Sequence, residues 1–218
     1  MKSLAPAFVL GCVVFLTSCA GSQIQTEALR TLLAKRLIVS LPEEIPFPNQ
    51  MTLTLSGLAG QTAAIGNQML ESFGTSSLEQ RIGEAVKNSG VSLRRQTAEL
   101  FARELRATDL FAGVTASGGD AQIELKVTRW GLAWNDSSGR YEPVLDMEAS
   151  LSVPPLGVVW RGHRTASELS TALSTQIFDL DPTLLATRPQ KLTQALNQVT
   201  EDLSRQLVEE LRGKAQAR

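Results

Sequence analysis

The side chains best suited to chemistry are few in this sequence: two cysteines, Cys12 and Cys19, and a single histidine, His163. Zinc sites combine three or four Cys, His and carboxylate ligands, and one imidazole does not supply the common sets. A Ser-His-Asp site would also depend on His163, and no G-x-S-x-G elbow accompanies it. We therefore expect His163 to be a solvated side chain, and we expect a protein that is not an enzyme and binds no metal or cofactor.

The glycine-rich stretches do not have the pattern of a phosphate-binding loop. Gly57-Leu58-Ala59-Gly60 and Gly118-Gly119 lack both the Lys-Ser/Thr of a P-loop and the G-x-G-x-x-G of a dinucleotide site. The charge balance is close to neutral, with 21 basic and 22 acidic residues among 218. Binding to nucleic acid depends on many contacts between Lys or Arg and phosphates, so we expect no nucleic-acid partner.

The first 19 residues have the layout of a secretory signal. Lys2 precedes an uncharged apolar run from Leu4 to Phe15, which closes on small residues. The run is shorter than the roughly 20 apolar residues that a membrane span needs. The closing Leu16-Thr17-Ser18-Cys19 resembles the lipobox of bacterial lipoproteins. The resemblance implies cleavage before Cys19 and acylation of this cysteine, by chains such as palmitate, on its sulfur and its new amine. The alternative is an apolar N-terminal helix with a chance cysteine.

Cleavage at this site would divide the chain into three parts. We expect a lipoprotein signal peptide at residues 1–18, a lipidated cysteine and tether at 19–35, and a single domain at 36–218. The signal peptide carries Lys2 and no acidic residue, so 20 basic and 22 acidic side chains would remain, a net charge of −2. Ala20 follows the cysteine, at the position where Asp would act as a retention signal. By the same resemblance, Ala20 implies that the protein is located at the outer membrane of a diderm envelope, with its domain facing the periplasm.

Two regions have the spacing of amphipathic helices. The first runs from Ser77 to Phe111 with a break or kink at Gly90, and the second runs from Thr187 to Leu211. Their apolar residues recur every three or four positions, which places them on one face of each helix. These residues are Leu78, Ile82, Val86, Leu93, Leu100, Phe101 and Leu105 in the first region, and Leu192, Leu196, Val199, Leu203, Leu207 and Leu211 in the second. Each helix therefore needs an apolar surface to cover.

Three segments alternate between apolar and polar residues, as antiparallel strands do. Residues 121–128 and 145–153 alternate cleanly, and the turn residues at 135–140 join them in a hairpin. In a third strand we expect Val158 and Trp160 on the buried face, with Val159, Arg161 and His163 on the exposed one.

The order of elements predicts the fold class. Shorter strands are expected at 37–41 and 51–56, ahead of the first helical region. The apolar faces of the two amphipathic helices must be covered, and the meander of strands has one apolar face that can cover them. We predict an α+β two-layer sandwich, in which an antiparallel sheet of about four or five strands is covered on one face by two amphipathic helices.

The apolar residues change phase at the far end of the hairpin. They occupy odd positions early in the strand, whereas Trp130, Leu132 and Trp134 occupy even positions. A bulge near Thr128-Arg129 would return them to the core, and without a bulge they lie on the second face of the sheet. Val144, the one apolar residue on the second face of the partner strand, would then lie near them. We favour this exposed patch, which would bind a partner or a ligand.

Residues 57–77 allow three interpretations. They are rich in Gly, Ala, Gln, Ser and Thr, and Gly60, Gly66 and Gly74 weaken a helix. We favour a surface loop; the alternatives are a lid over a binding site and a third layer over the tryptophan patch.

The run from Thr97 to Leu132 resembles part of a known group of envelope proteins. It consists of a helix ending in Leu-Phe, a glycine turn and Asp120-Ala121-Gln122-Ile123-Glu124-Leu125. It is similar to small domains such as the TolB amino-terminal domain and the ABC-transport auxiliary lipoproteins. The resemblance implies a non-enzymatic accessory of envelope transport or assembly, held at a membrane by its lipid anchor and bound to an envelope protein. The alternative is a carrier of a lipid or another hydrophobic ligand.

Overall fold

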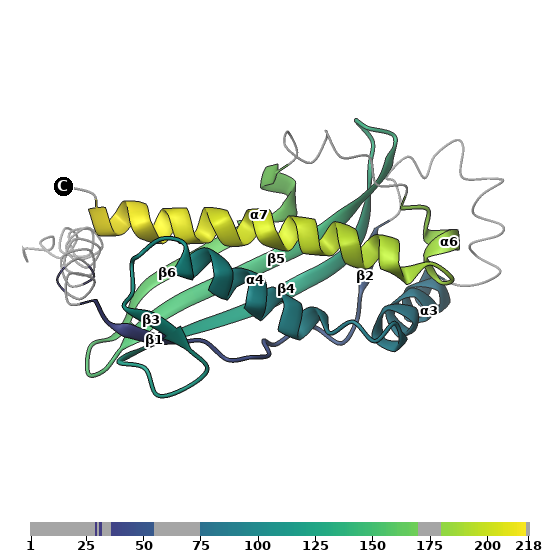
Figure 1. Cartoon of the computed structure of the whole chain (residues 1–218). Helices are drawn as coiled ribbons and strands as arrows, with labels where there is room; N and C mark the ends of the chain where they lie inside the picture. Colours follow the sequence, from purple (N-terminus) through teal and green to yellow (C-terminus); the bar gives the residue numbers. More distant parts are fainter. Residues whose placement is uncertain (1–28, 30, 32–35, 55–74, 170–179, 217–218) are drawn as a thin grey trace, which may run out of the picture.

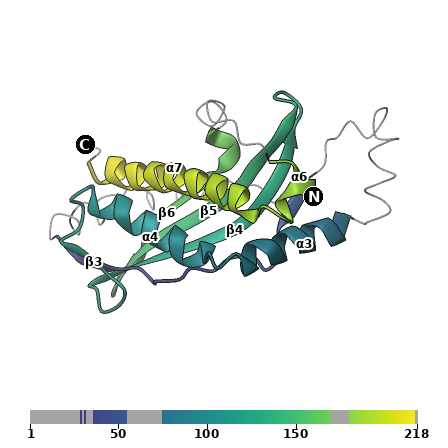
Figure 2. The same cartoon turned by 45° about the vertical axis from the view of Figure 1, so that its right-hand side comes forward.

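The computed structural model describes residues 29, 31, 36–54, 75–169 and 180–216. Their elements are β1 (Ile38–Ser40), β2 (Thr52–Thr54), α3 (Thr75–Asn88), α4 (Leu93–Arg106), β3 (Gly113–Thr115), β4 (Ala121–Asn135), β5 (Arg140–Val153), β6 (Gly157–Thr165), the 3-10 helix η1 (Ala166–Leu169), α6 (Pro182–Leu185) and α7 (Pro189–Gln216). Six strands form one sheet, and α4 and α7 lie side by side on one of its faces (Figure 1; Figure 2). The predicted α+β sandwich is confirmed, with six strands where about four or five were expected.

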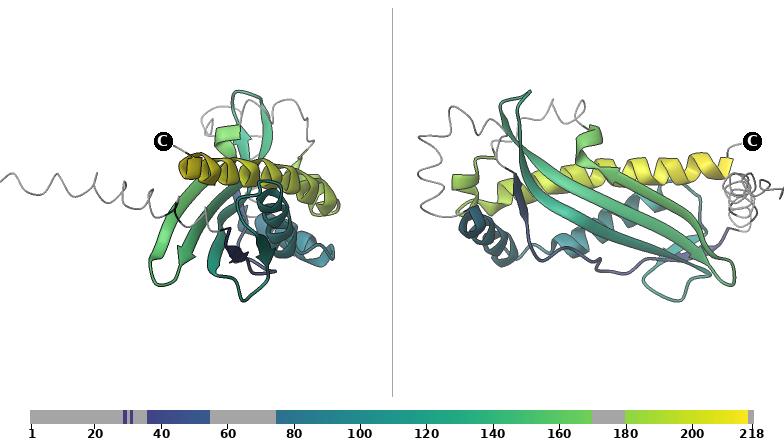
Figure 3. Two further views of the ribbon diagram at one scale, coloured as in Figure 1. Left: turned by 60° about the vertical axis from the view of Figure 1, so that its left-hand side comes forward. Right: turned by 180° about the vertical axis from the view of Figure 1, so that it is seen from behind.

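The centre of the sheet is the meander of β4, β5 and β6. β4 and β5 pair antiparallel over almost their whole length, with Ile123 opposite Leu151 and Leu125 opposite Ala149. β6 pairs antiparallel with the other edge of β5. Alternation along these strands directs their apolar side chains toward α7 and most of their charged side chains to the opposite face. Seen from behind, the sheet lies in front of the helices (Figure 3).

The segment that contains β1 and β2 runs along the free edge of β4 as a broken parallel strand. Val39 of β1 lies opposite Ala121, and β2 pairs with β4 further along. Between them the Val127 N–H donates to the Pro46 carbonyl oxygen at 3.0 Å. Prolines have no N–H to contribute to a ladder, so this segment does not form one continuous strand. The sheet is therefore mixed: the expected antiparallel pairing holds for β4 to β6, while β1, β2 and β3 pair parallel to their neighbours.

An irregularity in the β5–β6 ladder reverses one expectation. Leu151 pairs with Trp160 and Ser152 pairs with Val158, so Val159 is the extra residue of a bulge. Val159 and Trp160 are 6% and 4% exposed, whereas Val158 is 37% exposed. The prediction that Val158 is buried and Val159 exposed was wrong, because it assumed an unbroken ladder.

Local sequence fixes where the helices begin and end. Gly90, with φ of +76°, ends α3 in the left-handed conformation that glycine adopts without cost. The Ser92 hydroxyl then caps α4 by accepting the Arg95 N–H at 3.3 Å. The helices bury their apolar stripes against the sheet in one core, whose fully buried large side chains include Phe101, Leu105, Ile123, Leu125, Met147 and Leu151.

The folded domain includes Leu29, which is 1% exposed and belongs to the same core. This residue lies upstream of the expected start of the domain at residue 36, so the expected tether is shorter than residues 19–35. The expected signal peptide at residues 1–18, Cys19 and residues 57–74 lie outside the described residues. None of the described helices is both long enough and apolar enough to span a bilayer.

Candidate functional site

The β4–β5 hairpin contains a bulge, which was one of the two explanations for the shift of the apolar residues from odd to even positions. The register shifts between Val127 and Arg129, which leaves Thr128 without a ladder partner. The extra residue returns the three bulky side chains that follow to the face under the helices. Trp130 is 6% exposed and Leu132 is fully buried. The exposed patch that we favoured from the sequence was therefore wrong, and the bulge was the correct alternative.

Trp130 is held from two directions. Its indole Nε1 donates to the Pro48 carbonyl oxygen at 3.0 Å. The Phe47 ring meets its ring edge-on, with centroids 6.4 Å apart, an arrangement that aromatic pairs prefer. Leu145 lies opposite it on β5. The loop before β2 thus fixes the orientation of this side chain.

Trp134 and Val144, the other members of the expected patch, lie apart from Trp130. Trp134 packs edge-on against Tyr141 at the hairpin end, with ring centroids 5.2 Å apart, and both are half-buried. Burial raises the pKa of Tyr141, and the negative charge of Asp181 adds to the rise, so the phenol stays neutral at physiological pH. Val144 is half-buried opposite Gly131, on the other face of the sheet.

A groove of about 790 Å³ opens beside Trp130. It lies where α3 ends and α4 begins, and the loop before β2 closes one side. Its lining consists of Phe47, Pro48, Asn49, Gly83, Val86, Lys87, Gly90, Val91, Ser92, Leu93, Arg94 and Trp130. The volume is within the range of about 300–1,000 Å³ that ligand sites in proteins occupy. We call this feature the Trp130 groove.

The charges of the Trp130 groove have one sign. Lys87 and Arg94 are both exposed, and no acidic side chain is among the described residues that line the groove. The first turn of α4 also faces the groove, and its free N–H groups add positive potential. An apolar surface with two cations at its rim can bind an apolar group that carries a negative charge.

The sequence analysis missed Phe47, Lys87 and Arg94 as site residues. They come from three segments that the fold brings together around Trp130. Lys87 and Arg94 lie on the polar sides of their helices, where a cation is usually only solvated. No spacing signal in the sequence distinguishes them from other surface cations, and only the α3–α4 turn at Gly90 brings them to one groove.

A second cavity, of about 530 Å³, lies at the outer face of the sheet and contains His163. His163 is exposed opposite Glu148, as predicted. Glu148 also accepts from Lys126 at 2.8 Å. This hydrogen bond raises the pKa of Lys126 and lowers that of Glu148, so the pair stays charged at neutral pH. The charges of this cavity compensate one another, which is typical of a solvated sheet face.

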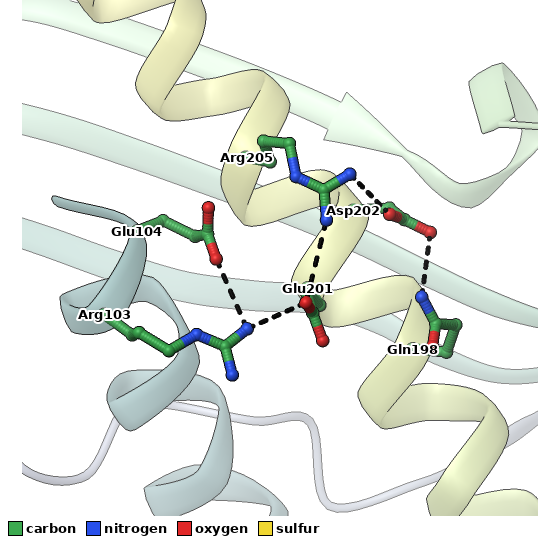
Figure 4. A network of polar contacts seen from close by, with 6 residues as sticks. All are labelled: Arg103, Glu104, Gln198, Glu201, Asp202 and Arg205. Atoms are coloured by element: carbon green, nitrogen blue, oxygen red, sulfur yellow. Dashed lines mark hydrogen bonds and ion pairs between the residues drawn. The ribbon is translucent and has the colours of Figure 1, made fainter. Parts of the chain in front are cut away.

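A polar network joins α4 to α7 on the outside of the helical layer (Figure 4). Arg103 donates to Glu201 at 2.9 Å and to Glu104 at 3.3 Å, and these contacts raise its pKa. Arg205 continues the network to Glu201 and Asp202 along α7. Exposed ion pairs contribute little to stability. We therefore infer that the role of this network is to align the two helices.

Neither metal chemistry nor a known relative identifies the site. Among the described residues, no group of three or more His, Cys, Asp and Glu side chains could hold a metal ion. Comparison of the chain with protein-family models, curated proteins and solved structures returned no match. The resemblance to envelope lipoproteins stays a prediction, and the Trp130 groove is the feature from which a function can be argued.

Proposed function

We propose that this chain is a non-enzymatic, lipid-anchored accessory protein of envelope transport or assembly. Acylated Cys19 holds it at the periplasmic face of the outer membrane, and the Trp130 groove binds a segment of an envelope protein partner. The observation that carries the binding role is the groove itself, whose lining combines the apolar side chains of Phe47, Val91 and Leu93 with two cations and, among the described residues, no acidic side chain. The Leu16–Cys19 box carries the anchoring role.

The composition of the groove supports a protein partner. Protein interfaces are enriched in aromatic residues and Arg and depleted of acidic residues at their centre, and Trp and Arg are frequent hot spots. Phe47 and Arg94 supply these residue types at one place, beside the largely buried Trp130. The complementary segment is an apolar stretch of a partner with at least one Asp or Glu beside it.

A second candidate function rests on the same lining. An acyl chain would also fit an apolar groove of this size, and its carboxylate or phosphate would lie near Lys87 and Arg94. The protein would then be a carrier of an anionic lipid. Solvent extraction of the purified protein distinguishes the two functions, once the mass of the covalent lipid anchor is known. A non-covalent lipid recovered in a one-to-one ratio to the protein supports the carrier.

Charge reversal at the groove rim tests the leading proposal. A photoreactive amino acid at Val91, inside the groove, should crosslink the partner in cells. Lys87→Glu with Arg94→Glu should reduce this crosslink by about tenfold or more, because two attractions on the order of 1 kcal/mol each become repulsions. The matched control, Lys126→Glu with Arg188→Glu, makes the same charge change at positions outside the groove and should leave the crosslink intact. A crosslink that survives the rim reversal would contradict binding in the groove.

A further inference from the structure

Three of the four exposed large apolar side chains among the described residues lie at one end of the domain. The four are Ile38, Leu156, Val158 and Leu184, which are 41%, 57%, 37% and 40% exposed. Ile38 begins β1, and Leu156 and Val158 belong to the β5–β6 turn and the start of β6. Leu184 is in α6 at the opposite end of the molecule (Figure 1; Figure 3).

Strand pairing places the first three at the same end of the sheet. β1 meets the beginning of β4 at Val39 and Ala121. The beginning of β4 meets the end of β5 at Gln122 and Ser152, and Ser152 in turn pairs with Val158. We call Ile38, Leu156 and Val158 the apolar end.

The β5–β6 turn is exposed, carries no charge and has a leucine among its exposed residues. No residue from Leu151 to Trp160 is charged, and Pro154, Pro155 and Leu156 are all exposed. Turns on protein surfaces mostly use Gly, Pro, Asn, Asp and Ser, so Leu156 is the one residue at 154–157 that this preference does not explain. A protruding apolar turn with an exposed leucine fits an apolar medium better than water.

The path of the chain identifies which apolar medium lies close. The chain enters the sheet at β1, which is part of the apolar end. Cys19 is only ten residues upstream of Leu29, the first described residue of the core. Ten extended residues span at most about 35 Å, which is less than the roughly 42 Å length of a 28-residue helix such as α7. A lipid on Cys19 therefore keeps Leu29 closer to the bilayer than the length of α7.

Two exposed cations lie next to the apolar end, and the Asp120 carboxylate accepts the Ile38 N–H there at 3.0 Å. Arg36 is two residues before Ile38, and Arg161 follows the uncharged run of β6. Arginine can keep its guanidinium among lipid headgroups while apolar neighbours enter the acyl region. The Trp130 groove is at the α3–α4 junction, away from this end (Figure 1).

We propose that the apolar end inserts shallowly into the lipid surface that holds Cys19. This contact, which rests on the lipid anchor of the proposed function, fixes the orientation of the domain. The β5–β6 turn faces the bilayer, and α6 and the Trp130 groove face the periplasm, where a partner can reach the groove.

Two leucines at opposite ends provide a matched test. The protein purified from membranes is reconstituted into vesicles of phosphatidylethanolamine and phosphatidylglycerol, with an environment-sensitive fluorescent amino acid at position 156 or at position 184. We expect the probe at 156 to shift to the blue and to be quenched by doxyl-labelled lipids, and the probe at 184 to do neither. Equal responses at both positions, or no response at 156, would overturn the proposal.

The mass of the same preparation separates this proposal from the anchor. If Cys19 carries acyl chains and the probe at 156 does not respond, the anchor stands and the insertion fails. If Cys19 is not acylated, the anchor fails, and the same probes are read on unacylated protein mixed with the vesicles. A response at 156 alone then supports insertion without an anchor, and no response rejects it.

Discussion

Trp130→Ala is expected to destabilise the domain by about 3–5 kcal/mol, the range measured when large aromatic side chains are removed from cores. The side chain is 6% exposed, packs against Phe47 and lies opposite Leu145. The substitution also leaves the Pro48 carbonyl without the indole N–H. The measurement is the denaturant midpoint, with an unchanged slope as the sign that two-state unfolding is retained.

Three variants make this result specific. Leu151→Ala, at a core position 1% exposed, should cost about 2–5 kcal/mol. Trp134→Ala should cost clearly less than Trp130→Ala, because Trp134 is only half-buried. Trp130→Phe keeps an aromatic ring and should cost less than Trp130→Ala, because it loses the hydrogen bond, about 0.5–1.5 kcal/mol, and only part of the buried ring. A Trp130→Ala variant as stable as the wild type would reject the bulge and the buried tryptophan together.

Gly131→Ala is the second change with a large expected effect. Gly131 has φ of +146°, which side-chain-bearing residues rarely adopt. A Cβ atom there would collide with the Thr52 backbone oxygen of β2. Strain of this kind costs on the order of 1–3 kcal/mol, and the collision adds to it. We expect a loss of at least about 3 kcal/mol and increased hydrogen exchange of the β2 amides.

Gly139→Ala is the matched control for this substitution. Gly139 also has a positive φ, of +65°, but a Cβ atom there meets nothing within 4 Å. It should therefore cost only the backbone strain, about 1–2 kcal/mol, and leave β2 protected from exchange. Equal losses for the two variants would show that β2 does not lie against Gly131.

The β4–β5 hairpin could be predicted from the sequence because one face is buried and the other wet. Alternation in such a sheet fixes the face of every residue, since a slip by one position exposes the whole apolar set. The change of the apolar residues from odd to even positions at Trp130 was compatible with a bulge or with an exposed patch, and the sequence alone did not decide between them. The position of Val144 in the sequence suggested an exposed patch with Trp130. In the observed register Val144 lies opposite Gly131, on the other face of the sheet from Trp130.

The two short N-terminal strands lie within the ranges expected from the sequence, but their parallel pairing with β4 and the Trp130 groove could not be predicted from it, for a different reason. β1 and β2 have three residues each, and their parallel partner β4 lies far along the chain. Such pairing depends on the edge that β4 leaves free, which no local pattern encodes. The Trp130 groove likewise depends on the path of the loop around Pro48 and on the turn at Gly90.

The mass of the mature chain tests the central claim, that this domain acts at a membrane as a lipid-anchored protein. Protein extracted from membranes should yield an N-terminal peptide that begins at Cys19 and carries acyl chains, and Cys19→Ala should abolish incorporation of labelled palmitate. A peptide that retains residues 1–18, or an unmodified Cys19 in protein recovered from membranes, would contradict the account.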